Sequence, residues 1–97
     1  MPQRHITSVD LPKHLTVLVV DDDPAFRHIV RYTLERNNVV QYSLIEAGCI
    51  TDAVKALGQH TFDVVTLDVR LPDYDDAEEG IKTIRSVDAY TPVIILT

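Results

Sequence analysis

The sequence predicts an open α/β fold in which helices cover a parallel sheet. Three runs of mostly apolar, β-branched residues stand at 15–20, 62–67 and 92–97, and they are apolar at successive positions rather than at every second one. Strands buried on both faces of a parallel sheet have this composition. Segments with helical spacing of apolar residues separate these runs. Such alternation is typical of parallel strands joined by right-handed crossovers.

Length and charge restrict the possible functions. The 97 residues fit one small domain, and the formal net charge of −6 argues against direct binding to DNA or RNA, which requires clustered Lys and Arg. No apolar run approaches the roughly 20 residues that span a bilayer, and the N-terminus lacks the apolar core of a signal peptide. We therefore expect a cytoplasmic domain with no membrane segment.

The chain divides into two regions. Residues 1–14 are polar, contain two prolines and show no sustained period, so we expect an N-terminal leader that is partly disordered. Residues 15–97 form the domain, and "LTVLVV" at 15–20 is its first strand.

The first helix is predicted directly after this strand. Asp23 stands as N-cap and Pro24 at the first helical position, a pair that favours helix initiation. The helix is expected to end near Asn37. Its apolar stripe, spaced at i, i+3 and i+4, is expected to face the sheet and consists of Phe26, Ile29, Val30, Thr33 and Leu34.

The remaining elements complete a βαβαβαβ order. The mixed run 39–46 suits an edge strand, and 62–67 and 92–97 suit strands buried on both faces. Thr51 is predicted to cap a short second helix with the inward residues Ile50, Ala53, Val54 and Leu57. A third helix is predicted from about Gly80 to Asp88, with the inward residues Ile81, Ile84 and Val87.

Polar residues stand where the predicted strands end. Asp21, Asp22 and Asp23 follow the first strand, Asp68 follows 62–67 and Thr97 ends 92–97. Open α/β sheets bind ligands outside the carboxyl ends of their strands, so these groups are expected to converge. Carboxylates held close together repel one another and favour a cation. A hard ion such as Mg²⁺ suits this oxygen donor set, and no His or Cys spacing suits zinc.

Asp68 stands alone at its strand end, whereas Asp21 and Asp22 are adjacent. A carboxylate can attack phosphorus and form an acyl phosphate. Phosphoryl transfer then requires mainly positioning and charge neutralisation. We therefore interpret Asp68 as a phosphoryl acceptor and the adjacent pair as metal holders.

Three motifs carry a resemblance to a known family. The stretches "VLVVDDDPAFR", "DVVTLDVRLPD" and "TPVIILT", in this order and spacing, resemble the receiver domain of bacterial response regulators, the signalling half of two-component systems. The resemblance covers about residues 15–97. It implies a flavodoxin-like, doubly wound parallel sheet with strand order 2-1-3-4. It also implies a sensor histidine kinase or phosphotransfer protein as partner, and a C-terminal output domain.

The resemblance assigns roles to individual residues. Asp68 matches the phosphoacceptor, Asp22 and Asp68 match direct Mg²⁺ ligands, and Asp21 matches a ligand through water. The backbone carbonyl of Arg70 matches the third protein ligand, and its side chain could tune the phosphoryl lifetime. Thr97 matches the hydroxyl residue that hydrogen-bonds the phosphoryl group and moves on activation.

The chain departs from the family pattern in two ways. Asp76 stands where the family usually has a glycine, and the next glycine is Gly80. The acidic loop 73–79 therefore looks about four residues longer than in the family, and its extra carboxylates could either attract a metal ion or repel a phosphodonor. The family has five strands, and the sequence stops after the fourth. We therefore expect an incomplete receiver domain, truncated after the fourth strand, without the fifth strand, the last helices and the family's active-site lysine. Its uncovered apolar fourth-strand edge predicts a dimer or swapped oligomer.

Three functions compete on these observations. The leading hypothesis is a signalling domain, not an enzyme beyond its own phosphoryl transfer and dephosphorylation, that accepts a phosphoryl group on Asp68 and switches an output. The alternative is a degenerate receiver that acts as a protein–protein interaction module without phosphorylation. The third is a Mg²⁺-dependent phosphohydrolase using Asp21 and Asp23 as an Asp-x-Asp pair, although Ala25 stands where such enzymes usually have Thr or Val.

Overall fold

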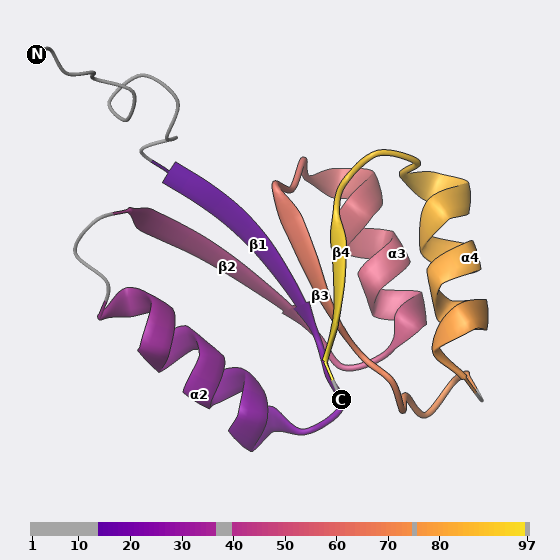
Figure 1. The fold of residues 1–97 in the computed structure, drawn as a ribbon, viewed down its shortest axis with the longest axis horizontal. Helices are drawn as coiled ribbons and strands as arrows, with labels where there is room; N and C mark the ends of the chain where they lie inside the picture. The colour runs from indigo at the N-terminus through magenta and orange to yellow at the C-terminus, as the bar shows by residue number, and fades with distance from the viewer. Residues whose placement is uncertain (1–13, 37–39, 75, 97) are drawn as a thin grey trace, which may run out of the picture.

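The computed structural model describes residues 14–36, 40–74 and 76–96. Four parallel strands form one sheet in the order β2-β1-β3-β4, which confirms the predicted fold class and strand order (Figure 1). The strands are β1 His14–Val20, β2 Gln41–Ala47, β3 Val64–Asp68 and β4 Val93–Leu96. β1 therefore begins one residue inside the predicted leader, and residues 1–13 of that leader lie outside the described residues.

Helices lie on both faces of the sheet (Figure 1). Helix α2 (Pro24–Glu35) covers one face, beside β1 and β2, while α3 (Ile50–Gln59) and α4 (Ala77–Val87) pack side by side on the other. Parallel strands joined by helical crossovers bring the carboxyl ends of β1, β3 and β4 to the same edge.

The hydrophobic core lies between the sheet and the α3–α4 pair. Alternate residues of β1 and β3 point to this side, because successive side chains of a strand face opposite ways. The sheet contributes Leu18, Val20, Val65 and Leu67, all buried. The helices contribute Ile50, Ala53, Ala56, Leu57 and Ile84. The inward faces predicted for α3 and for the centre of α4 are therefore largely confirmed.

Helix α2 begins as predicted. Asp23 is its N-cap and accepts the N–H of Ala25 at 2.9 Å, and Pro24 is the first helical residue. The predicted apolar face is too wide, because Ile29 is 58% exposed and Thr33 is exposed. Of the predicted apolar face, only the i, i+4 row of Phe26, Val30 and Leu34 is half-buried. Helix α2 ends at Glu35 with Arg36 as C-cap; the predicted end at Asn37 lies outside the described residues.

The prediction that Thr51 caps α3 is wrong. The N-cap is Cys49, whose side chain makes no capping hydrogen bond, and Thr51 lies inside the first turn. The carboxylate of Asp73 instead accepts the N–H groups of Ile50 and Thr51, at 3.0 and 2.9 Å, and the Thr51 hydroxyl at 3.0 Å. A loop carboxylate therefore satisfies the free N–H groups at the start of this helix.

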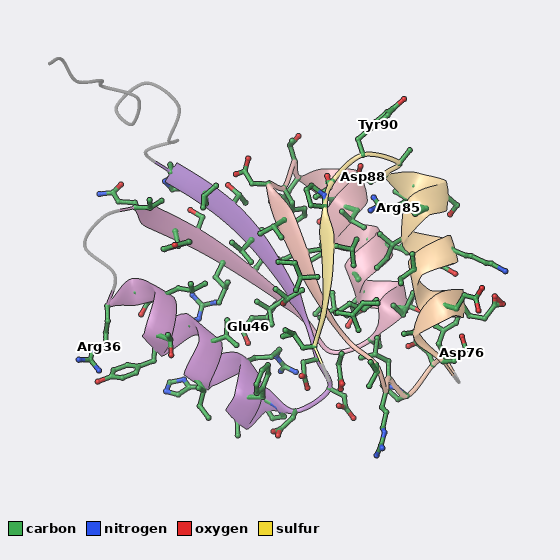
Figure 2. The ribbon with its side chains drawn as sticks, viewed as in Figure 1. Arg36, Glu46, Asp76, Arg85, Asp88 and Tyr90 are labelled. Atoms are coloured by element: carbon green, nitrogen blue, oxygen red, sulfur yellow. The ribbon has the colours of Figure 1, made fainter. Side chains whose placement is uncertain are left out.

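Helix α4 begins three residues earlier than predicted, so part of the predicted acidic loop is helical. Asp76 is the N-cap and accepts the N–H of Glu79 at 2.9 Å (Figure 2). Acidic residues in a first helical turn interact favourably with the helix dipole, which explains why Glu78 and Glu79 extend α4. The predicted inward position of Val87 is also wrong, since this residue is 44% exposed.

A hydrogen-bonded turn connects α4 to β4. Asp88 accepts the N–H groups of Tyr90 and Thr91, and the guanidinium of Arg85 donates to the Thr91 carbonyl at 2.6 Å. Figure 2 shows Arg85 and Asp88 together at the end of α4, with Tyr90 pointing away from the protein. This turn fixes where β4 starts beside β3. Within the described ranges, the three helices are all too short or too polar to cross a membrane.

Candidate functional site

Three carboxylates meet at the carboxyl edge of the sheet. Asp21 and Asp22 follow β1, and Asp68 is the last residue of the adjacent parallel strand β3. Each offers one oxygen, and these oxygens all lie within 4.8 Å of one another. The strand ends therefore converge as expected, because neighbouring parallel strands terminate side by side.

The carboxylates line a cleft with both polar and apolar walls. The turn after β1 forms one side, and the turn after β3 forms another. Its described lining residues are Asp21, Asp22, Asp23, Phe26, Asp68, Val69, Arg70 and Leu96. The predicted residue Thr97 lies outside the described residues, but Leu96 before it pairs in register with Asp68.

Asp21 is the most buried member of the cluster, with only 9% of its surface exposed. Burial raises the pKa of the Asp21 carboxyl above its ordinary value of 3.8. The hydrogen bond that Oδ1 accepts from the N–H of Asp23, at 2.9 Å, opposes this rise in the pKa, and the charges of Asp68 and Asp22 add to it. A cation placed among the three carboxylates would relieve this penalty on the ionised form.

Asp22 and Asp68 are more accessible. The Asp22 side chain is exposed, and Asp68 is half-buried. The N–H of Arg70 donates to Oδ1 of Asp68 at 3.3 Å, which holds the turn after β3 against the carboxylate. The side chain of Arg70 is exposed, although the residue contributes to the cleft. This arrangement gives the cleft two accessible carboxylates, Asp22 and Asp68, next to the buried carboxylate of Asp21.

The donor set fits a magnesium ion. All three ligating groups are carboxylate oxygens, the type that hard divalent cations prefer. In the described part of the chain this is the one cluster of three or more His, Cys, Asp or Glu side chains close enough to share a metal. Asp23 is not a member of the cluster, because it caps helix α2. This weakens the Asp-x-Asp phosphohydrolase hypothesis, which needs both Asp21 and Asp23.

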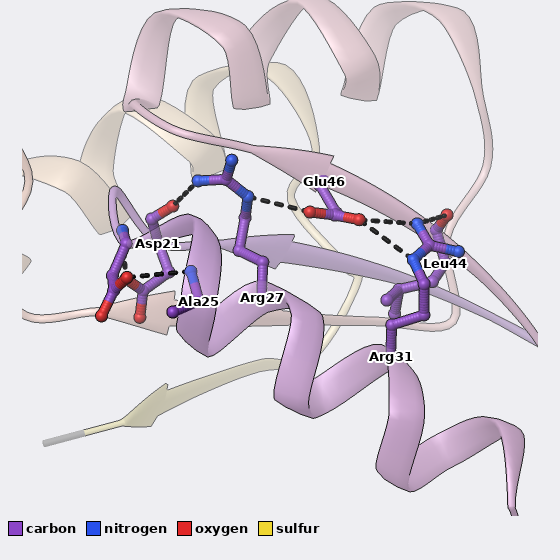
Figure 3. Close-up of polar contacts among 7 residues, drawn as sticks. Asp21, Ala25, Arg27, Arg31, Leu44 and Glu46 are labelled. Atoms are coloured by element: carbon purple, nitrogen blue, oxygen red, sulfur yellow. Dashed lines mark hydrogen bonds and ion pairs between the residues drawn. The ribbon is translucent and has the colours of Figure 1, made fainter.

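An ion-pair network behind the cluster was not predicted from the sequence. Arg27 of α2 donates from Nη1 to the carbonyl oxygen of Asp21 at 2.6 Å and from Nε to Glu46 of β2 at 2.9 Å (Figure 3). Arg31 pairs with the other oxygen of Glu46 at 2.7 Å. Hydrogen bonds from Arg31 and Arg27 lower the pKa of Glu46. The i, i+4 spacing of the two arginines was visible in the sequence, but their shared partner on another element was not.

Comparison with known proteins identifies the family. The model of the response regulator receiver domain matches residues 17–97, which is most of the chain. The chain belongs to the response regulator receiver domain family. The receiver match includes every residue of the acidic cluster and both turns that line its cleft.

Several proteins illustrate this membership. The receiver is 44% identical to the sensory transduction protein LytT of Bacillus cereus over 59 residues, covering 61% of this chain and 24% of LytT. It is 34% identical to the transcriptional regulatory protein ResD of Bacillus subtilis over 89 residues, covering 92% of this chain and 35% of ResD. The structure of the MaeR response regulator bound to beryllium trifluoride superimposes with a TM-score of 0.73 at 29% identity, covering 86% of this chain and 66% of MaeR.

The receiver therefore spans about a quarter to a third of the curated relatives and about two thirds of the matched solved chain. Membership in the family makes the chain a signalling domain of two-component systems. The acidic cleft is the natural place to look for its chemistry, because ligands of such sheets bind at the carboxyl edge.

Proposed function

We propose that this chain is a phospho-accepting receiver in which Asp68 takes a phosphoryl group from a histidine kinase or phosphotransfer protein in the presence of Mg²⁺. The observation that carries the proposal is the convergence of carboxylate oxygens of Asp21, Asp22 and Asp68, within 4.8 Å of one another, in the lining of one cleft. Family membership supports it, since phosphoryl signalling is the role the family pattern implies.

The metal would be held by Asp22 and Asp68 directly, by Asp21 through water and by the carbonyl of Arg70. When bound, Mg²⁺ neutralises charge on the carboxylates and on the oxygens of the transferred phosphoryl group. Asp22 and Asp68 are accessible from the cleft, as direct ligands must be. Asp21 is the buried member of the trio, which suits a residue that acts through water and fixes local charge.

Asp68 is the accepting group. One carboxylate oxygen of Asp68 attacks the phosphorus of phosphohistidine, the P–N bond breaks, and its electron pair stays on the imidazole nitrogen. The product is an acyl phosphate on Asp68. The added negative charge at the strand end would then be sensed by the hydroxyl of Thr97, which follows β4 in the sequence, and passed to an output domain.

The remaining expectations belong to the same proposal. The domain acts in the cytoplasm with its kinase and is not an enzyme apart from its own phosphoryl transfer and dephosphorylation.

An oligomer through the β4 edge is supported by Ile94 and Ile95, which are 51% and 40% exposed. Sedimentation at micromolar concentrations tests the oligomer, and a well-folded monomer throughout would contradict it.

A direct experiment tests the phosphoacceptor. The protein is incubated with phosphoramidate and Mg²⁺, and intact mass spectrometry measures the gain of one phosphoryl group. We expect a base-labile adduct that is absent from Asp68→Asn and from samples with excess EDTA. Beryllium trifluoride, which MaeR binds, serves as a second probe, detected by ¹⁹F NMR. The absence of this adduct from the folded wild-type protein in the presence of Mg²⁺ would refute the proposal.

One observation favours the interaction-module alternative. The described lining of the cleft contains Arg70 as its basic residue and no lysine, since Lys55 and Lys82 lie within α3 and α4. A Mg²⁺ titration separates the two functions. A scaffold without phosphorylation should show no saturable site that Asp22→Ala abolishes, whereas the phosphoacceptor should show one.

A further inference from the structure

We propose that Arg27 is a positioning residue for the acidic cluster: it fixes the peptide group between Asp21 and Asp22 and so directs the Asp22 carboxylate toward Asp68. This inference rests on the proposed metal-binding function of the cluster. Arg27 does not itself touch the cleft, because it is not among the residues that line it.

The contacts of Arg27 place it behind the cluster. Its Nη1 donates to the carbonyl oxygen of Asp21 at 2.6 Å, and its Nε donates to Glu46 at 2.9 Å. The side chain is only 20% exposed. A short charge-assisted hydrogen bond in a partly dry setting holds its acceptor more firmly than a neutral bond exposed to water. The Asp21 carbonyl is therefore anchored to helix α2.

Both peptide groups around Asp22 are held in place. Arg27 holds the Asp21 carbonyl on one side, and Oδ1 of Asp21 accepts the N–H of Asp23 at 2.9 Å on the other. The exposed Asp22 side chain depends on its backbone for direction, because little protein surface packs around it. Loosening either anchor would let the Asp22 carboxylate move away from Asp68.

Glu46 holds the guanidinium of Arg27 and also pairs with Arg31. Glu46 accepts from Arg27 with one carboxylate oxygen and from Arg31 with the other, and Arg31 also donates to the carbonyl oxygen of Leu44 at 3.3 Å (Figure 3). The network thus ties α2 to β2, and Arg27 alone of the two arginines reaches the Asp21 carbonyl in the contacts described. Arg31 is therefore a matched control for Arg27.

The sign of the effect separates positioning from simple charge. Arg27 is a cation near three carboxylates, so its positive charge by itself opposes the binding of Mg²⁺. If Arg27 acted only through charge, Arg27→Gln would tighten Mg²⁺ binding. If Arg27 positions the cluster, the same variant weakens it, since losing a partner of a metal ligand commonly reduces metal affinity about 10–100-fold.

The experiment measures Mg²⁺ affinity by isothermal titration calorimetry, with Mn²⁺ relaxation as a second probe. We expect Arg27→Gln to weaken binding about tenfold, Arg27→Lys to recover part of the loss, and Arg31→Gln to change affinity less than twofold. Amide NMR of metal-free Arg27→Lys should show faster hydrogen exchange at Asp23 than in the wild type, which keeps the inference testable if Arg27→Gln does not fold.

The outcomes distinguish the role of Arg27 from the proposed metal site. Unchanged or tighter Mg²⁺ binding in Arg27→Gln, or an equal loss in Arg31→Gln, would overturn the role of Arg27 and leave the metal site standing. Unchanged exchange at Asp23 in Arg27→Lys would also count against it. A wild-type protein that binds no Mg²⁺ would overturn the proposed function and this inference together.

Discussion

The carboxylate of Asp73 binds the first turn of helix α3 through the N–H of Ile50, at 3.0 Å, although Asp73 lies 23 residues further along the chain. The same carboxylate binds the N–H and hydroxyl of Thr51. The loop that follows Asp68 and Arg70 is thereby fastened to a helix that packs on the core. Asp73 thus links the first turn of α3 to the loop that follows the cleft residues Asp68 and Arg70.

Removing this carboxylate should destabilise the protein measurably. We expect Asp73→Ala to lower the free energy of unfolding by about 1 kcal/mol, the usual value of a capping side chain. Thr51→Val, which removes the hydroxyl and keeps the N–H, should cost less. Urea unfolding followed by circular dichroism measures both. A stability of Asp73→Ala equal to that of the wild type would show that water replaces the contact at no cost.

The contribution of Asp73 should depend on pH. Burial opposes ionisation of this carboxyl, but the hydrogen bonds from Ile50 and Thr51 outweigh burial and lower its pKa below 3.8. A carboxyl with a pKa depressed on folding stabilises the protein above its unfolded pKa, and this stabilisation is lost as the pH falls through the folded pKa. The window of loss therefore lies below about pH 4.

Unfolding curves at several pH values test this dependence. The difference in free energy of unfolding between the wild type and Asp73→Asn should be constant near neutral pH and shrink below pH 4. Glu46 and Asp88, whose pKa values are also lowered by arginine and by Thr91 contacts respectively, will steepen the acid limb of both proteins equally. A difference that stays constant down to pH 2.5 would contradict the assignment to Asp73.

Local signals in the sequence predicted the framework well, and contacts between distant segments explain the errors. Asp23 and Pro24 set the start of α2 because a cap acts on its own next residues. The prediction that Thr51 caps α3 failed because Thr51 resembles a local cap, whereas the acceptor at the start of α3 is the carboxylate of Asp73. The cluster was predictable since strand order brings Asp21 and Asp68 to one edge. Arg27 was not, because its carbonyl partner carries no side-chain signal.

The buried charge of Asp21 should make the metal-free protein less stable than it could be. The pKa of Asp21 is raised on folding, so folding disfavours its ionised form and stability falls as the pH rises through the interval above 3.8. Asparagine keeps an oxygen for the N–H of Asp23. We expect Asp21→Asn to raise the free energy of unfolding at neutral pH by about 0.5–2 kcal/mol.

Magnesium should reverse this ranking. A ligand that binds only the folded state stabilises it by RT ln(1 + [L]/Kd), so Mg²⁺ should stabilise the wild type and have little effect on Asp21→Asn. Urea unfolding with and without Mg²⁺ measures the free energy of unfolding of both proteins. Asp22→Asn is the control for charge alone. Because Asp22 is exposed, this substitution should raise the free energy of unfolding in metal-free buffer by less than Asp21→Asn does. Lower stability of Asp21→Asn than wild type without metal would refute the account.

The contact between α3 and α4 depends on the absence of a side chain at Gly80. This glycine is buried in α4, and a Cβ placed on it would lie 3.1 Å from Cδ1 of Ile50, which is itself fully buried. Alanine gains about 1 kcal/mol over glycine in a helix, but overpacking a core costs about 1–3 kcal/mol. We therefore expect Gly80→Ala to destabilise the wild type.

Ile50→Val removes the crowding methyl group at a cost of about 0.5–1.5 kcal/mol. In that background Gly80→Ala should stabilise the protein, giving a coupling of at least about 1 kcal/mol in a double-mutant cycle. Additive effects of the two substitutions would mean that α4 shifts away from Ile50 freely, and that close approach of the helices does not explain the glycine.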